Sequence, residues 1–271
     1  MHDHGTTGSW GITLLFAAPF VLAALLYGGG VVVEARRGRP WPWPRTLAWL
    51  AGVAMAGIAT VGPLIVPVDP GFVAHMWTHL LVGMVAPVLL VVACPVTLAL
   101  RSLHVRRARQ ISRVLNSAPA RLIAHPITAA ILSVGGMWLL YATDLYGMML
   151  QSLLVHLAVM THFLVAGVLF TAAVIPCDPS PHRAPYPMRM VVLVVALAAH
   201  DILAKVIYAS PPAGTTSADG QSGALLMYYG GDIVDAVIIT ILCAQWYRAA
   251  GRRMLRSRTP SLVVDGVAGA P

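Results

Sequence analysis

Charged residues are scarce in this sequence, and their scarcity excludes an ordinary soluble domain. Only 10% of the 271 residues are charged, whereas 58% are hydrophobic, and the mean hydropathy is +0.77. A soluble domain usually has about 25% charged residues, which keep its surface hydrated. We therefore expect an all-α polytopic membrane protein, since helices satisfy their own backbone hydrogen bonds in lipid.

Acidic residues are fewer than basic residues, 10 against 18, so the formal net charge is +8. This excess does not indicate a nucleic-acid-binding protein, because the basic residues form short clusters between apolar runs. Such clusters are typical of the topology signals of membrane proteins. We expect contact with membrane lipid and none with nucleic acid.

Cysteine occurs only three times, as Cys94, Cys177 and Cys243, and the sequence has no C-x-x-C pair. From this spacing neither a disulfide framework nor a thiolate metal site follows. The N-terminus lacks a basic segment and an A-x-A cleavage site, so the first apolar run is expected to be a retained helix. No nucleophile with its base and no phosphate-binding loop is visible, and we expect no enzymatic turnover.

Long apolar runs, in contrast, are abundant. A spanning helix needs about 20 apolar residues, and seven runs have about that length: 12–33, 46–66, 73–100, 126–143, 150–175, 189–208 and 224–247. The sequence thus predicts an outer tail over 1–11, a seven-helix transmembrane domain over 12–248, and a basic, partly disordered cytoplasmic tail over 249–271. Prolines inside these runs predict kinks, at Pro63, Pro87 and Pro95.

The arginines indicate the orientation of this seven-helix domain. They follow the first, third, fifth and seventh runs: Arg36, Arg37, Arg39, Arg45, Arg101, Arg106, Arg107, Arg109, Arg113, Arg121, Arg183, Arg189, Arg248, Arg252, Arg253, Arg256 and Arg258. Seven helices place all of them on one side of the membrane. By the positive-inside rule the N-terminus is outside and the C-terminus is cytoplasmic.

The third run opens with two histidines at i and i+4, His75 and His79, beside Met76. Residues four apart share a helical face, with Cβ atoms about 6 Å apart, so both imidazoles can reach one metal ion. His156 and Met160 repeat this spacing in the outer half of the run 150–175. Imidazoles and thioethers suit Cu(I), and these five residues are the predicted ligands.

The alternative interpretation is that the histidines hydrogen-bond backbone carbonyls and that the methionines fill gaps in the core. Further polar residues are predicted in the membrane near the same outer layer: His162, His200, Asp201, Lys205, Asp232 and Asp235. Charges in hydrocarbon are costly, so these side chains are expected to face the bundle interior as a supporting layer. Within it, Asp201 and Lys205 have the spacing of an ion pair, and Gly230-Gly231 predicts close approach of another helix.

Three segments resemble a known family. They are His75-Met-x-x-His79-x-Leu followed by Ala86-Pro87-x-Leu-Leu and Pro95; His156 and His162-Phe-x-x-x-Gly167-x-x-Phe170; and Asp219-x-Gln221-x-Gly223-x-x-x-Met227, which has one residue inserted. Together they resemble the CtaG-type cytochrome c oxidase assembly proteins, also called caa3-type oxidase assembly factors. The resemblance extends from about residue 46 to residue 248.

The resemblance implies a seven-helix plasma-membrane protein that aids insertion of copper, as Cu(I), into a haem-copper oxidase. The implied partners are oxidase subunits and a copper donor on the outer side. It supplies no ligand set, so the metal ligands remain an inference from residue chemistry and depth. Three alternatives stay open: a metal-free scaffold for oxidase assembly, a haem carrier with axial histidines from two helices, and a copper transporter with ligands continuing inward.

Overall fold

The computed structural model describes residues 6–65, 71–179 and 183–257, which are helical and contain no strand. The prediction of an all-α protein is confirmed for these ranges. The elements are α1 (Thr6–Arg36), α2 (Trp43–Ile65), α3 (Phe72–His79), η1 (Leu80–Val85), α4 (Ala86–Val92), α5 (Pro95–Ser102), α6 (Val105–Leu115), α7 (Ala118–Ile123), α8 (Pro126–Ala130), η2 (Ile131–Gly135), α9 (Gly136–Ala142), α10 (Leu145–Gln151), α11 (Leu153–Val174), α12 (Tyr186–Ala209) and α13 (Ser217–Ser257).

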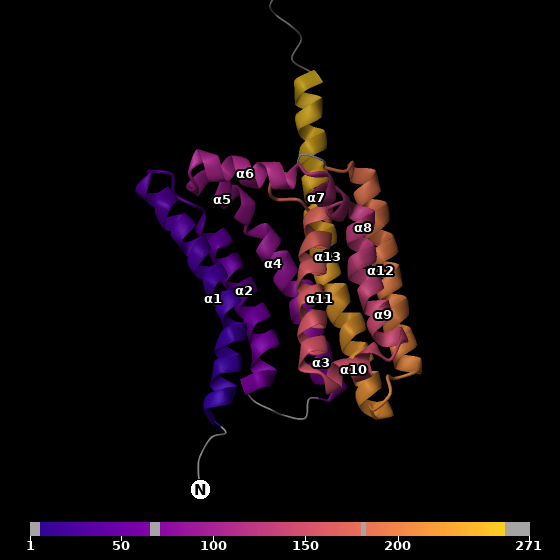
Figure 1. Cartoon of the computed structure of the whole chain (residues 1–271). Helices are drawn as coiled ribbons and strands as arrows, with labels where there is room; N and C mark the ends of the chain where they lie inside the picture. Colours follow the sequence, from indigo (N-terminus) through magenta and orange to yellow (C-terminus); the bar gives the residue numbers. More distant parts are fainter. Residues whose placement is uncertain (1–5, 66–70, 180–182, 258–271) are drawn as a thin grey trace, which may run out of the picture.

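The described residues form six helices that are long and apolar enough to cross a membrane. A seventh candidate is the pair Pro126–Ala142 and Leu145–Gln151, which is bent by 80°. Figure 1 shows α8 and α9 in line beside α12, running from one end of the bundle to the other. Each of the seven predicted apolar runs therefore corresponds to a helical segment of the bundle.

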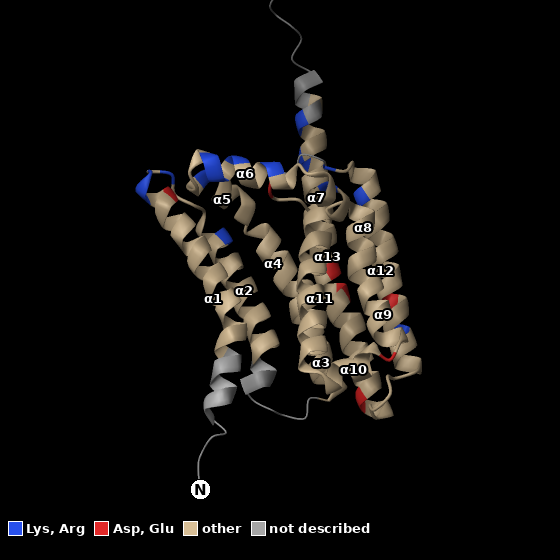
Figure 2. Cartoon of the chain, viewed as in Figure 1, with Lys and Arg blue, Asp and Glu red and all other residues tan. Residues whose placement is uncertain are grey.

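Basic residues gather at one end of the bundle, where α6 lies and where α13 leaves the bundle (Figure 2). We call this the arginine end. Helix α1 begins at the other end, which we call the opposite end. The sequence predicts this one-sided distribution of arginines. The positive-inside rule infers orientation from such a distribution.

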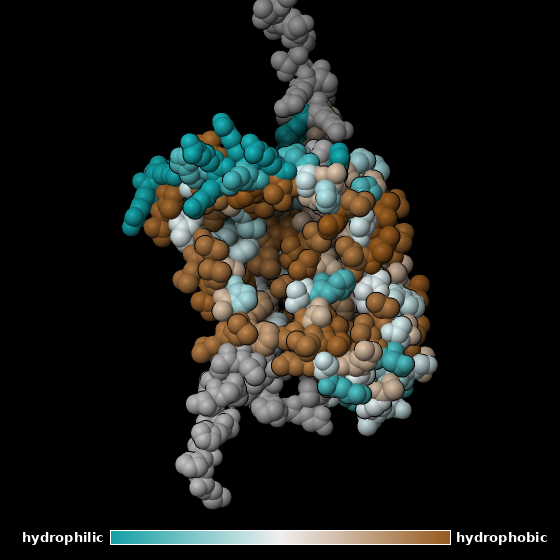
Figure 3. All heavy atoms as spheres, in the orientation of Figure 1, coloured by the Kyte–Doolittle hydropathy of each residue, from teal (hydrophilic) through white to brown (hydrophobic). Residues whose placement is uncertain are grey.

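The surface between the two ends is apolar. On the face shown in Figure 3, hydrophilic side chains gather at the arginine end above a hydrophobic band. Helix α1 packs against α2 and α5 and exposes leucines along its length, among them Leu15 and Leu26. The segment 101–125, expected as an arginine-rich loop, forms α6 and α7. Helix α6 crosses the arginine end with no buried residue, as amphipathic helices do at a membrane surface.

The third apolar run is not one continuous helix. After His79 the backbone makes a π-helical turn, η1, and α4 ends at Val92, two residues before Cys94. Cys94 has the left-handed conformation, with φ 53° and ψ 54°. Proline lacks an N–H donor and disfavours the α conformation in the preceding residue. The kink predicted at Pro95 is therefore a full break, and α5 begins there as a separate helix.

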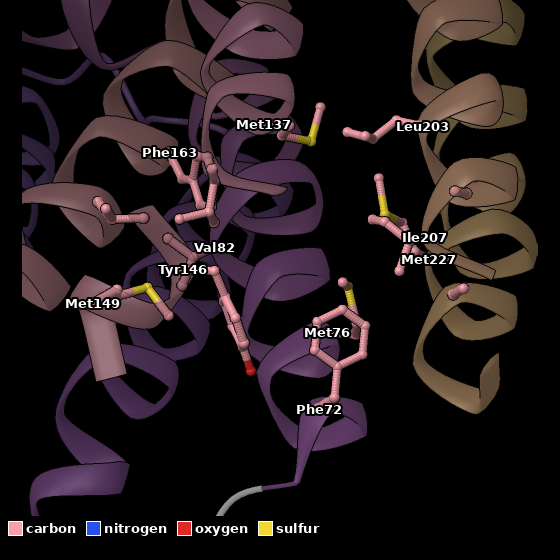
Figure 4. Packing of buried hydrophobic residues seen from close by; sticks show 14 of the residues in the cluster. Phe72, Met76, Val82, Met137, Tyr146, Met149, Phe163, Leu203, Ile207 and Met227 are labelled. Carbon is pink, nitrogen blue, oxygen red and sulfur yellow. The ribbon is translucent and has the colours of Figure 1, made fainter. Parts of the chain in front are cut away.

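The core near the opposite end combines methionines with aromatic rings (Figure 4). Its buried members include Phe72, Met76, Tyr146, Met160 and Met227. Methionine is flexible enough to fill the irregular spaces between such rings. Several methionines therefore have the packing role that was the alternative interpretation of the sequence. This core holds α3, α9 and α11 to α13 around the site described next.

Candidate functional site

A small pocket of about 40 Å³ lies between the two π-helical turns. Gly83 and Met84 line it from η1, and Ser133 and Val134 line it from η2. A π-turn adds a residue to a helix and shifts the side chains that follow, and such turns recur at functional sites. A pocket of this volume accommodates an ion or a water molecule.

Two buried histidines, His79 from α3 and His200 from α12, line this pocket. Their residues are 2% and 3% exposed, and the ring centroids lie 6.4 Å apart. Within the described part of the chain, neither nitrogen of either ring has a hydrogen-bond partner. An unpaired buried polar group costs about 1–3 kcal/mol. Both nitrogens of His79 and Nε2 of His200 are therefore available to a ligand, whereas His200 Nδ1 lies 3.6 Å from a carboxylate oxygen of Asp201.

Packing holds both rings in place. The His79 ring meets Phe163 edge to face, with centroids 5.0 Å apart. A Cβ atom added at Gly231 would lie only 2.6 Å from Cε1 of His200, so the absence of a side chain at this position makes room for the ring. The close helix approach predicted from Gly230-Gly231 is confirmed, because α12 packs directly on α13 there.

Carboxylates lie beside the histidines. Asp235 of α13 is 5% exposed and lines the pocket, and Asp201 and Asp232 are near enough to interact with it electrostatically. Asp201 Oδ1 lies 3.6 Å from His200 Nδ1. In the described ranges Asp201 makes no ion pair with Lys205, contrary to the predicted pairing. Lys205 instead extends over the Tyr228 ring, 5.4 Å from its centroid, where a cation–π interaction stabilises the ammonium group.

His75 has a different environment from His79. Its Nε2 is hydrogen-bonded to the Tyr141 hydroxyl at 2.9 Å, and that hydroxyl donates to Met76 Sδ at 3.9 Å. The two histidines share a helical face, as predicted, yet their rings contact different neighbours. His75 and Met76 therefore form a group of their own, about one helical turn before His79 on the same helix.

The other predicted site residues are dispersed. His156 is half-buried and near enough to His75 to interact with it electrostatically. Met160 is buried and lines a separate apolar pocket with Phe16. His162 is exposed and donates from Nε2 to the carbonyl of Leu132 in η2 at 3.0 Å. Asp232 is exposed.

No three His, Cys, Asp or Glu side chains of the described residues are grouped to hold a metal ion. A copper site built from these residues therefore uses methionine sulfur or only two of those side chains. This requirement favours the pocket that His79 and His200 share with Met84 and Met137.

Two residues have positioning roles that were not predicted from the sequence. The carboxylate of Asp219, in the first turn of α13, accepts hydrogen bonds from the backbone N–H groups of Phe72 and Val73. It thereby caps α3 and anchors the helix that carries His75 and His79. Tyr141 is the other, because it binds both His75 and Met76. The motif containing Asp219 was visible in the sequence, but its partner helix was not.

Comparisons with known proteins identify the family of this sequence. A family model described as cytochrome c oxidase caa3 assembly factor (Caa3_CtaG) matches residues 25–249. Uncharacterised proteins of Mycobacterium bovis and Mycobacterium tuberculosis are each 36% identical over 204 residues, which cover 70% of this chain and 30% of the relative. An uncharacterised protein of Mycobacterium leprae is 29% identical over 274 residues, covering 91% of this chain and 41% of the relative.

The chain thus spans less than half the length of these curated relatives. No solved structure matches it significantly. The family model, however, covers most of the chain, including α3, η1, α11 and the pocket between the π-turns. This chain belongs to the family of caa3-type cytochrome c oxidase assembly factors.

Proposed function

We propose that this protein assists assembly of a haem-copper oxidase in the plasma membrane by holding Cu(I) between His79 and His200. Family membership supports the assembly role. One observation carries the copper proposal: two buried imidazoles line a pocket of ionic size, and among the described residues their nitrogens make no hydrogen bond, the contact nearest to one being that of His200 Nδ1 with Asp201 at 3.6 Å. The protein acts by binding and handing over its cargo, without catalytic turnover.

The donor set suits a soft monovalent ion. Metal–nitrogen bonds are about 2 Å long, so an ion held in line between one nitrogen of each ring would place the centroids about 6 Å apart. The two centroids lie 6.4 Å apart, with the ring planes inclined by 25°. The thioethers of Met84 and Met137 line the same pocket, and thioethers favour Cu(I). Neutral imidazoles need no deprotonation, and Asp235 supplies one nearby carboxylate.

Other occupants fit this pocket less well. Structural zinc usually takes four ligands that include cysteine or carboxylate, and calcium takes six or more oxygen ligands. The described residues offer no cluster of that kind. A porphyrin is far larger than 40 Å³, which disfavours the haem-carrier alternative at this position.

The position of the pocket suits exchange with an outer partner. His79 lies about 10 Å along the helix from the start of α3 at 1.5 Å per residue, on the side of the opposite end. By the positive-inside rule that end faces outward, toward a copper donor and the oxidase subunit that receives the ion. We assign His75 and Met76, one turn nearer that end, to the route of entry and release.

Copper content of purified protein tests the ligand set. The full chain is loaded with Cu(I) in detergent under reducing conditions, beside three variants. His79→Ala/His200→Ala is expected to lose the pocket-bound ion. His75→Ala/His156→Ala tests the set predicted from the sequence and is expected to keep it, and His104→Ala, altered at an exposed histidine of the arginine end, is the control.

A cellular readout separates the copper role from the scaffold alternative. Cells lacking the native gene are complemented with each folded variant, and the copper content of the oxidase is measured. Loss of oxidase copper with His79→Ala/His200→Ala supports the proposal. Full oxidase copper with that variant, at wild-type protein level, refutes it and favours a metal-free scaffold.

A further inference from the structure

Two cysteines that are far apart in the sequence meet at the arginine end. Cys94 occupies the break between α4 and α5, and Cys177 follows α11. Both side chains line the same pocket and interact with each other, while the Cys94 thiol donates to the carbonyl of Val92 at 3.4 Å and the Cys177 thiol to the carbonyl of Ile175 at 3.5 Å. Cys94 is buried and Cys177 is half-buried. The pair cannot be predicted from a C-x-x-C spacing in the sequence. The packing of α11 against α4 brings the two cysteines together.

The surrounding structure holds both cysteines in position. The carboxylate of Asp178, next to Cys177, accepts from the backbone N–H of Val96 at 3.1 Å and from the N–H and hydroxyl of Thr97 at 2.7 Å and 2.6 Å. It caps α5 and ties the Cys177 loop to the Cys94 break. Its oxygens are therefore already engaged, and it is not a free ligand.

The other side of the break is held by a buried hydrogen-bonded chain. Trp41 Nε1 donates to the Tyr27 hydroxyl at 2.8 Å, and that hydroxyl donates to the carbonyl of Ala93 at 2.9 Å. Cys94 itself has φ 53°, a conformation that is unfavourable for a residue with a side chain. Strained positions of this kind persist where the surroundings determine them, and they cluster at functional sites.

The thiols line a pocket of about 430 Å³ that is strongly basic. The described residues around it include four arginines and no acid: Arg45, Arg183, Arg248 and Arg252. An anionic group between the sulfurs and the arginines is thus electrostatically favoured.

We propose that Cys94 and Cys177 together bind one Cu(I) ion at the arginine end. Both thiols lose their protons to water as two copper–sulfur bonds form, so the dithiolate complex carries one negative charge and no electron is transferred. The arginines of the pocket offset that charge. The described residues provide no third His, Cys, Asp or Glu ligand there, which disfavours four-coordinate zinc, whereas Cu(I) accepts two soft ligands. This site does not depend on the His79–His200 pocket.

Protection from alkylation tests the site in the unaltered protein. The full chain is purified anaerobically in detergent, mixed with Cu(I) and a competing Cu(I) chelator, and alkylated. Mass spectrometry then measures the extent of alkylation at each cysteine. Copper is expected to slow alkylation of Cys94 and Cys177 at least about tenfold and to leave Cys243, which is exposed on α13, unchanged. Equal protection of all three cysteines, or none, overturns the proposal.

Copper stoichiometry gives a second measurement. Cys94→Ser and Cys177→Ser are each expected to lose one equivalent of Cu(I) and the ultraviolet thiolate-to-copper band, whereas the matched control Cys243→Ser keeps both. The same measurement in a His79→Ala/His200→Ala background isolates the cysteine site, so failure here and failure of the proposed pocket are distinguishable. Unchanged copper in folded Cys94→Ser, or a Cys94–Cys177 disulfide in place of bound copper, refutes the proposal.

Discussion

Substituting Gly231 by alanine probes the histidine pocket without removing any polar group. The added Cβ atom would lie 2.6 Å from His200 Cε1, whereas ordinary contact begins at 3.4 Å. The imidazole must therefore retreat by about 0.8 Å, and this kind of overpacking costs about 1–3 kcal/mol. Metal–ligand distances vary by only about 0.2 Å. We expect Cu(I) binding to weaken about 10–100-fold, the usual effect of disturbing a ligand's support.

The matched control is Gly29→Ala. Gly29 is also helical, and nothing lies within 4 Å of a Cβ atom added there. Both variants gain about 1 kcal/mol of helix propensity, so their difference isolates the clash with His200. We expect Gly231→Ala to melt at least about 2 °C below Gly29→Ala, since 1 kcal/mol shifts the melting temperature by about 2–4 °C. Equal melting temperatures and equal Cu(I) affinities would refute the packing argument.

Three further substitutions and one pH profile test the supporting structure. Asp219→Ala removes the cap of α3 and is expected to cost about 1–2 kcal/mol, measured as a lower melting temperature; no change would contradict the capping role. Asp178→Ala removes three hydrogen bonds at α5, so it should cost about 2–3 kcal/mol and change the alkylation rate of Cys177 more than that of Cys243. Tyr141→Phe leaves the buried His75 imidazole without its hydrogen-bond partner. The free energy of unfolding is expected to fall by about 1–3 kcal/mol, measured as a lower melting temperature. The interaction between the two thiols lowers the pKa of Cys177 and raises that of Cys94, so alkylation of Cys177 should begin at lower pH; coincident pH profiles would contradict this difference in pKa.

Local properties of the chain determined the class of this protein. Apolar composition and run length predicted the helices, because hydrocarbon admits a helix wherever about 20 apolar residues follow one another. The arginine clusters predicted which connections share an end, and Figure 2 shows them gathered there. The break at Pro95 was underestimated, since the sequence indicates a helix-disfavouring residue but not whether neighbouring groups will hold the chain in a full break.

The site was only half visible in the sequence. His79 was predicted from its spacing with His75, and His200 was assigned to the supporting polar layer. Their meeting depends on the rotation of α3 and α12 about their axes, which contacts between distant segments determine, such as the close approach of His200 to Gly231.

The same reason applies to the thiol pair of Cys94 and Cys177. Residue chemistry and depth follow from the chain itself, because each depends on near neighbours in sequence. Which side chains share a pocket depends on long-range packing, and only the tertiary structure decided it.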